Sequence, residues 1–202
     1  ISLKEQGVAG EVIPAYYSVK EAVFPFIKFP GVDVVLGPEM RSTGEVMGVG
    51  KTFSEAFLKA ELGAGERIPK TGKVFLSVDD SDKARLLPVA RRLQEEGYGL
   101  CATMGTAKFL RDNGIVTQIV NKVREGRPHI VDAIKNGEIA IVINTVCSQA
   151  ESIADSHSIR SSALKQRVPL YTTIAGSEAI SLSIGNLDNN DVYSVQELHR
   201  GL

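Results

Sequence analysis

Side chains suited to holding an anion follow the four most apolar stretches of the sequence. They are hydroxyls, amides, a glycine turn and two lysines, namely Ser77, Lys83, Thr103, Gly105, Thr106, Asn121, Lys122, Asn144 and Thr145. If those stretches are strands of an open α/β sheet, their carboxyl ends meet at the edge where such sheets bind ligands. The turn from Thr103 to Thr106 also opens a helix, so free N–H groups point into the same space. Two ammonium groups and a helix N-terminus suit a doubly charged phosphate.

A purely structural interpretation of the same residues is also open. Thr103 and Thr106 can cap a helix, and both lysines can be solvated surface groups. These strand ends show no paired carboxylates, no histidine beside a nucleophile and no metal cluster. His129 can reach the edge, but it suits a capping or surface position equally well. Three classes of function therefore compete: a sensor of a phosphorylated metabolite, a small-molecule lyase and a structural part of a larger assembly.

Residues 44–52, GEVMGVGKT, end like a nucleotide-binding P-loop. That loop needs a glycine, four free residues and then Gly-Lys-Ser/Thr, because this arc aims backbone N–H groups at the phosphates. Counting back from Gly50 places Glu45 at the first glycine position, and Gly44 lies one residue too early. A carboxylate there would face phosphate oxygens. We therefore expect no P-loop in this segment.

Alternating strands and helices are expected to position the strand-end residues. The expected strands cover residues 73–78, 98–103, 116–123, 138–145 and 169–173, and the expected helices cover 81–97, 105–114, 129–137, 156–167 and 177–185. In the first of these helices, Ser81 is expected as N-cap and Gly97 as the residue that ends it. This alternation predicts an α/β fold with a mostly parallel, Rossmann-like sheet and helices on both faces. The apolar run IAIVI fits a strand buried on both sides.

The first third of the chain has a different character. Residues 63–72 contain three glycines, a proline and three charges, which indicates a linker or a long turn. Before it, residues 50–62 predict a short helix with one apolar face, formed by Phe53, Ala56, Phe57 and Ala60. Residues 1–62 hold too little regular structure for a core of their own. Because the chain also starts at Ile1 without Met, we expect it to be an excised piece of a longer protein.

Composition excludes several classes of partner. The formal net charge is −1 and 43% of residues are hydrophobic, so nothing favours nucleic acid or an anionic membrane. The sequence has no run of about 18 apolar residues, and we expect no membrane span. Cys101 and Cys147 lie in or near apolar runs, which predicts reduced thiols and a cytoplasmic location. No Cys and His spacing matches a zinc site.

Several long strings resemble one known family. GPEMRS and TGEVMG, then ATMGTA, then NKVREGRPHIVDAIKNGEIAIVINT are similar to the carboxyl-terminal end of the large subunit of carbamoyl-phosphate synthase. The resemblance covers essentially the whole chain. It implies that residues 1–69 are the α+β tail of an ATP-grasp domain, the carbamoyl-phosphate synthetic half. It implies that residues 70–202 form a regulatory domain of the methylglyoxal-synthase-like fold.

The resemblance also implies an effector site. In bacterial members of the family this domain binds UMP as inhibitor and IMP as activator at overlapping positions. Carried over residue by residue, the phosphate ligands are Ser77, Lys83, Thr103, Gly105, Thr106, Lys122, Asn144 and Thr145. Val123 and Ile159 would lie near the base or ribose. Two departures retune the site, because Val146 replaces a threonine of the family pattern and the loop CSQAES is one residue longer.

A second effector, ornithine, is implied at the junction with the synthetic half. Glu21 matches an acidic ligand in SVKEAV, and Thr172 matches a hydroxyl in YTT. A tyrosine of the family pattern is Leu170 here, and the adjacent Tyr171 would point to the other face of a strand. Ornithine regulation is therefore left open. Methylglyoxal synthase itself carries a Gly-Gly-Asp stretch that has no counterpart in this chain, which argues against lyase chemistry.

For the complete protein, the resemblance implies an enzyme that makes carbamoyl phosphate from bicarbonate, ammonia and ATP for pyrimidine and arginine biosynthesis. Its cofactors would be ATP, magnesium and potassium, and a small glutaminase subunit would supply ammonia. The full enzyme is expected to be a homo-oligomer. The catalytic residues would lie upstream of Ile1, so we expect no catalytic residue, metal or cofactor in this segment, and no activity from it alone.

Overall fold

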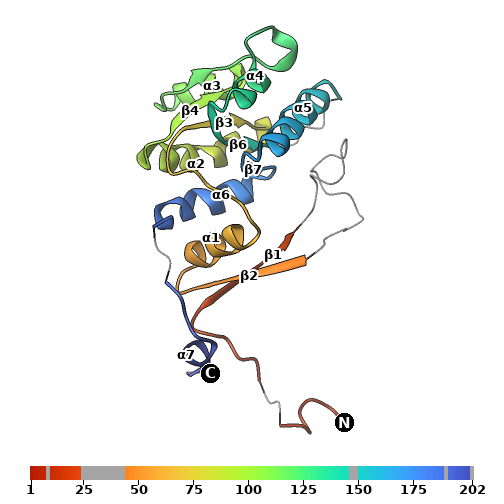
Figure 1. Cartoon of the computed structure of the whole chain (residues 1–202), viewed down its shortest axis with the longest axis vertical. Helices are drawn as coiled ribbons and strands as arrows, with labels where there is room; N and C mark the ends of the chain where they lie inside the picture. Colours follow the sequence, from red (N-terminus) through yellow and green to blue (C-terminus); the bar gives the residue numbers. More distant parts are fainter. Residues whose placement is uncertain (8–9, 24–43, 146–149, 189–190, 201–202) are drawn as a thin grey trace.

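The computed structural model describes residues 1–7, 10–23, 44–145, 150–188 and 191–200 (Figure 1). Five strands form one parallel sheet in the order β5-β4-β3-β6-β7. These strands are β3 (Lys73–Ser77), β4 (Gly99–Ala102), β5 (Gln118–Ile119), β6 (Ile139–Asn144) and β7 (Leu170–Tyr171). The chain builds outward from β3 in both directions, so the sheet has a switch point beside β3. The predicted parallel α/β sheet is confirmed.

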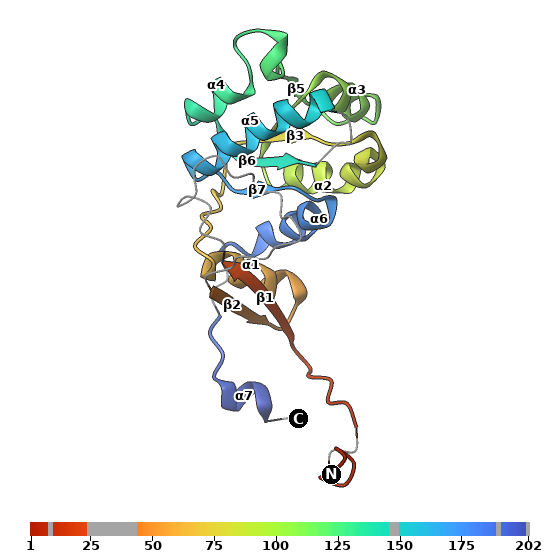
Figure 2. The ribbon, with the colours of Figure 1, turned by 90° about the vertical axis from the view of Figure 1, so that its right-hand side faces the viewer.

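Helices cover both faces of this sheet. They are α2 (Lys83–Glu95), α3 (Met104–Asp112), α4 (Ile130–Lys135), α5 (Ala150–Gln166) and α6 (Ile174–Ser183). Alternate residues of β3 face opposite ways, as a strand requires. Val74 and Leu76 pack in one buried cluster with α2, α3 and α6, whereas Phe75 packs in a second cluster with α4 and α5. Figure 2 shows α4 and α5 together on one side of the sheet.

The first third of the chain is more regular than the sequence indicated. β1 (Tyr17–Val23) and β2 (Gly44–Gly50) form an antiparallel ribbon, and α1 (Phe53–Gly63) packs on it. The segment GEVMGVG is therefore a strand, and Thr52 caps the helix that follows by accepting a hydrogen bond from Glu55 N. Two of its three glycines, Gly48 and Gly50, serve packing. A Cβ at Gly48 would lie 2.0 Å from Ala56 O, so α1 can approach this strand only because a side chain is absent.

Helix α1 is confirmed, but its predicted apolar face is only partly correct. Ala56 and Ala60 are fully buried, whereas Phe53 is 42% exposed. Leu58 is buried instead, in the cluster that contains Val74 of β3. The reason is that α1 lies between the β1-β2 ribbon and α6 and so buries two sides (Figure 1). One hydrophobic core therefore continues across position 69, where the sequence suggests a domain boundary.

Some element bounds differ from the expected ones. Ser81 is not the N-cap of α2, because a short 3₁₀ helix, η2 (Asp80–Asp82), precedes it and the α-helix starts at Lys83. Gly97 does follow the helix end, with φ of +87°. The third predicted strand shrinks to β5 at the sheet edge, and a further 3₁₀ helix, η3 (Val123–Glu125), comes soon after it. Helix α6 starts three residues earlier than expected because Thr173 caps it.

The chain ends away from the sheet. After η4 (Ile184–Asn186), the described part of the chain passes α1 and finishes in α7 (Val195–His199), which the sequence did not predict. Both termini lie at the end of the molecule remote from the sheet (Figures 1 and 2). Among the described helices, none combines the length and apolar character that a membrane crossing requires.

Candidate functional site

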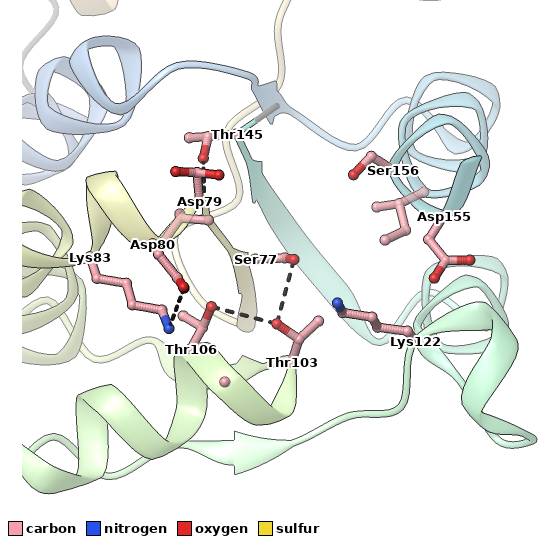
Figure 3. A pocket seen from close by; sticks show the side chains of 13 residues that line it. Ser77, Asp79, Asp80, Lys83, Thr103, Thr106, Lys122, Thr145, Asp155 and Ser156 are labelled. Atoms are coloured by element: carbon pink, nitrogen blue, oxygen red, sulfur yellow. Dashed lines mark hydrogen bonds and ion pairs between the residues drawn. The ribbon is translucent and has the colours of Figure 1, made fainter. Parts of the chain in front are cut away.

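A hollow of about 340 Å³ opens at the carboxyl ends of β3, β4 and β6 (Figure 3). It lies beside the switch point of the sheet, where open α/β sheets bind ligands. Thirteen residues line it: Ser77, Val78, Asp79, Asp80, Lys83, Thr103, Gly105, Thr106, Lys122, Thr145, Asp155, Ser156 and Ile159. Its floor and walls are hydroxyls, lysines, carboxylates and backbone, with few apolar groups. The hollow is therefore suited to a charged, strongly hydrogen-bonding ligand.

The N-terminus of α3 forms one wall. Thr103 is the N-cap residue, but its side chain does not cap the helix N–H groups. Its hydroxyl instead lies 3.5 Å from both Ser77 Oγ and Thr106 Oγ1. The first N–H groups of a helix have no intrahelical partner, and the helix dipole makes this end positive. Because α3 begins at the lining, its start offers donors to an anion in the hollow.

Two lysines approach the hollow from separate elements. Lys83 comes from the first residue of α2, and Lys122 comes from the residue that precedes η3. The Lys83 ammonium lies 3.7 Å from the position that a Cβ on Gly105 would take, so it sits over the start of α3. It pairs with Asp80 at 2.7 Å. Lys122 forms no ion pair with any residue that the structure describes, and Figure 3 shows its ammonium facing the hollow.

Three carboxylates also line the hollow, although no paired carboxylates were expected at the strand ends. Asp79 accepts hydrogen bonds from Ser81 N at 3.0 Å and Ser81 Oγ at 2.7 Å, which shapes the turn after β3. Asp155, on α5, lies 3.7 Å from Arg124 Nε. The run VDDSDK directly after the first strand is the signal that could have placed Asp79 and Asp80 here. Asp155 had no such signal, because its position depends on the path of α5.

Most residues predicted for phosphate binding come together around this hollow. They are Ser77, Lys83, Thr103, Gly105, Thr106, Lys122 and Thr145, joined by Ile159 from the predicted base or ribose contacts. They come from segments up to 82 positions apart, from Ser77 to Ile159. The sequence interpretation therefore located one real cluster in the fold.

Asn121, whose Nδ2 donates to Pro128 O at 3.3 Å, and two further predicted residues lie outside the lining. Asn144 is buried behind it, where Nδ2 donates to Ser77 O at 3.2 Å and Oδ1 accepts from Arg160 Nη1 at 3.4 Å. It therefore supports the ends of β3 and β6. Val123 packs against the second buried cluster rather than facing the hollow. His129 is the N-cap of α4 and accepts from Asp132 N, so its capping role is confirmed and a surface role is wrong.

The residues expected for ornithine lie elsewhere, at the junction between β1, α1 and β7. Glu21 Oε2 is buried and has no hydrogen-bond partner among the residues that the structure describes. Burial, and then the neighbouring charge of Glu66, raises the pKa of Glu21. Glu61, on α1, accepts a hydrogen bond from the Tyr171 hydroxyl at 3.2 Å, and burial raises the pKa of Glu61 to about 8. Thr172 follows Tyr171 directly.

Several predictions fall outside the described residues. Val146 and residues 147–149 of the altered loop lie there, and so does Cys147. Cys101 is a buried free thiol, and burial raises its pKa to about 11. In the described part of the chain, no three His, Cys, Asp or Glu side chains are grouped so that they could hold a metal ion.

Comparisons with known proteins agree with this architecture. The family model of the MGS-like domain matches residues 85–172. The carbamoyl phosphate synthase large chain of Pasteurella multocida is 73% identical over 201 residues, which is all of this chain and 19% of that protein. The large chains of Neisseria meningitidis serogroup A and Haemophilus ducreyi are 65% and 63% identical over 98% of this chain.

The chain spans about a fifth of the length of these relatives, 19% of the Neisseria meningitidis protein and 18% of the Haemophilus ducreyi protein. The resemblance expected from GPEMRS, ATMGTA and the long string at 121–145 is thus confirmed, and so is the predicted fold. The chain belongs to the carbamoyl phosphate synthase large-chain family, and it contains an MGS-like domain.

Proposed function

We propose that this chain is the regulatory part of a carbamoyl phosphate synthase large chain and that the hollow binds the phosphate of a nucleoside monophosphate, UMP or IMP. One observation carries the proposal: two lysines, two threonines and the start of α3 converge on a single hollow. Arrangements of this kind bind phosphate because charge-assisted hydrogen bonds are short and strong.

The geometry gives each group a role. Phosphate oxygens lie over the start of α3 and take hydrogen bonds from Thr103, Thr106 and the backbone of Gly105. The ammonium groups of Lys83 and Lys122 flank them. Ile159, the apolar residue of α5 in the lining, packs against the sugar or base, while Asp155 and Ser156 offer acceptors to its hydroxyl and N–H groups. The hollow of about 340 Å³ is at the small end of ligand sites.

Regulation requires that the nucleotide bind active and inactive conformations of the whole subunit unequally. The ligands come from separate loops, so binding draws those loops together. We propose that residues 1–69, the end of the synthetic ATP-grasp domain, transmit this difference. Support comes from the packing of α1 on α6 and from the core they share, because a shift of α6 would displace the side chains that pack against α1.

We propose a second effector, ornithine, at the junction that holds Glu21. Its ammonium groups would meet the carboxylates of Glu21 and Glu66 and would displace the proton that Glu61 holds, and Thr172 would supply a hydroxyl. The support is electrostatic. The charges of Glu21 and Glu66 both raise the pKa of Glu61, so a cation that entered this junction would relieve the repulsion among the three groups.

For the complete protein we propose ligase activity that makes carbamoyl phosphate in the cytoplasm, for pyrimidine and arginine synthesis. ATP, magnesium and potassium serve the ATP-grasp units, a glutaminase subunit supplies ammonia, and the enzyme is a homo-oligomer. Support comes from the high identity to large chains named carbamoyl phosphate synthase. The present segment is inactive alone in this proposal.

Calorimetric titration of the chain with UMP and IMP tests the site. We expect saturable binding that Lys83→Ala weakens at least tenfold, because a charged hydrogen bond to phosphate contributes about 1.5–3 kcal/mol. Lys108→Ala, which removes an exposed lysine of α3 outside the lining, is the matched control and should leave affinity unchanged. Absence of binding by the unaltered chain would favour a structural domain with a vestigial pocket.

The carboxylates in the lining suggest one alternative function, a phosphate lyase of the methylglyoxal-synthase kind. Asp79, Asp80 and Asp155 are carboxylates of the kind that proton abstraction uses. Asp80 is paired with Lys83, and Asp155 lies near Arg124. Release of methylglyoxal from dihydroxyacetone phosphate would identify a lyase, whereas nucleotide binding without turnover supports the sensor.

A further inference from the structure

The turn after β3 places a carboxylate on one of the two lysines of the hollow. Asp80 Oδ1 lies 2.7 Å from Lys83 Nζ. The two side chains differ in exposure, because Lys83 is 19% exposed and Asp80 is 90% exposed. Figure 3 shows this pair, with the Lys83 ammonium beside the Thr106 side chain. The lysine that a phosphate needs is therefore already neutralised by an exposed group of the same chain.

Local structure holds this pair in place. The Asp79 side chain accepts hydrogen bonds from Ser81 N and Oγ, and the Asp79 backbone N–H donates to Thr145 Oγ1 at 2.9 Å. Helix η2 then runs into α2, so Asp80 and Lys83 are three positions apart on one helical path and face each other. The Asp80–Lys83 contact therefore follows from the geometry of this turn, which the hydrogen bond to Thr145 holds against the end of β6.

The other carboxylates of the lining have different tasks. Asp79 shapes the turn through Ser81, and Asp155 lies 3.7 Å from Arg124. Counted together, the lining holds two lysines and three aspartates, a formal charge of −1. A phosphate dianion that entered without any rearrangement would meet excess negative charge. Asp80 is the carboxylate that can leave most easily, because it is the exposed partner of its ion pair.

We infer that Asp80 is an internal competitor for the phosphate subsite, and this inference rests on the proposed function of the hollow. In the unliganded chain the Asp80 carboxylate forms an ion pair with the Lys83 ammonium. An entering phosphate exchanges the Asp80–Lys83 pair for its own pair with Lys83, and Asp80 turns into solvent. The chain thereby binds its phosphorylated effector less tightly than the lysines and the α3 N-terminus alone would allow, which sets the effector concentration at which regulation begins.

The test compares four forms of the chain by calorimetry, with UMP and with inorganic phosphate as separate probes. They are the unaltered chain, Asp80→Asn, Asp80→Ala and Asp112→Asn. Asp112→Asn removes one exposed negative charge from the far end of α3 and is the matched control. We expect both Asp80 variants to bind each probe about three- to tenfold more tightly, because they lose a competing ion pair and a repelling charge. Asp112→Asn should change affinity less than twofold.

A double-variant cycle separates competition from a general charge effect. If Asp80 acts through Lys83, Asp80→Asn should tighten binding much less in a Lys83→Ala background, because there is no ammonium left to release. An equal gain in both backgrounds would overturn the proposed competition. Affinities of the Asp80 variants equal to those of the unaltered chain and Asp112→Asn would also overturn it, while the phosphate site would stand. Failure of every form to bind either probe would overturn the phosphate site itself.

Discussion

The Glu61 carboxylate on α1 accepts a hydrogen bond from the Tyr171 hydroxyl on β7, with 3.2 Å between Oε2 and Oη. This bond joins the first third of the chain to the parallel sheet. Both residues are buried, and Glu21 and Glu66 act on them electrostatically. Burial, followed by those two negative charges, raises the pKa of Glu61 to about 8, and the bond from Tyr171 offsets only part of that rise. The junction is therefore built around a carboxyl group that is protonated at neutral pH.

Stability should consequently fall as pH rises through this range. In the unfolded chain Glu61 titrates near its ordinary value of 4.5, and in the folded chain near 8. Between these values only the folded state holds the proton, so each increase in pH favours unfolding. Glu61→Gln keeps the acceptor for Tyr171 and removes the titration. We expect it to raise the free energy of unfolding on the order of 3 kcal/mol at pH 9 and much less at pH 5.

Urea unfolding at several pH values measures this effect. Glu95→Gln, at an exposed carboxylate of α2, is the control and should give the pH profile of the unaltered chain. If the free energy of unfolding of Glu61→Gln changed with pH in the same way as that of the unaltered chain, Glu61 would not hold the extra proton.

A second prediction concerns the approach of α1 to β2. Gly48→Ala places a Cβ where Ala56 O lies 2.0 Å away and Ala60 N 2.4 Å away, and both are backbone atoms that cannot move aside alone. We expect a loss of about 1–3 kcal/mol in stability, the range for forced overpacking of a buried contact. Gly44→Ala is the control in the same strand, because nothing lies within 4 Å of its Cβ position. Equal melting temperatures for both variants would contradict the close packing.

A third prediction concerns the last described residues. Tyr193 donates a hydrogen bond to Glu55 Oε1 at 2.9 Å, and its ring lies 4.5 Å below the Lys59 ammonium. Tyr193→Phe keeps the ring and removes the bond, so we expect only a small loss of stability. Tyr193→Ala removes both and should loosen the attachment to α1 of the segment that carries α7. Amide exchange measures this release, with faster exchange in residues 195–199 of the alanine variant. Unchanged exchange would show that α7 does not depend on Tyr193.

The sequence predicted the hollow because the sheet edge follows from element order. Once KVFLS and IAIVIN are read as parallel strands, Ser77 and Thr145 must end at the same edge. The start of a helix after Thr103 places its donors there too. The β1-β2 ribbon was missed for a physical reason: β2 has three glycines and an exposed face, so its alternation carries little apolar signal. Its partner β1 ends at Val23, well before β2 begins at Gly44, so no short hairpin turn signals the pairing.

The last prediction tests whether α3 holds the phosphate, and it uses Thr106, which is only 2% exposed yet lines the hollow. Thr106→Val preserves the shape of the side chain and removes the hydroxyl, which already accepts a long bond from Thr103 and keeps its own proton for a ligand oxygen. Losing one hydrogen bond to a charged phosphate costs about 1.5–3 kcal/mol, so UMP affinity should fall roughly 10- to 100-fold. Thr117→Val, at a buried threonine that bonds Ile115 O outside the hollow, should lower stability and leave affinity unchanged. Equal UMP affinities for the two valine variants would show that α3 does not hold the phosphate, even if Lys83 does.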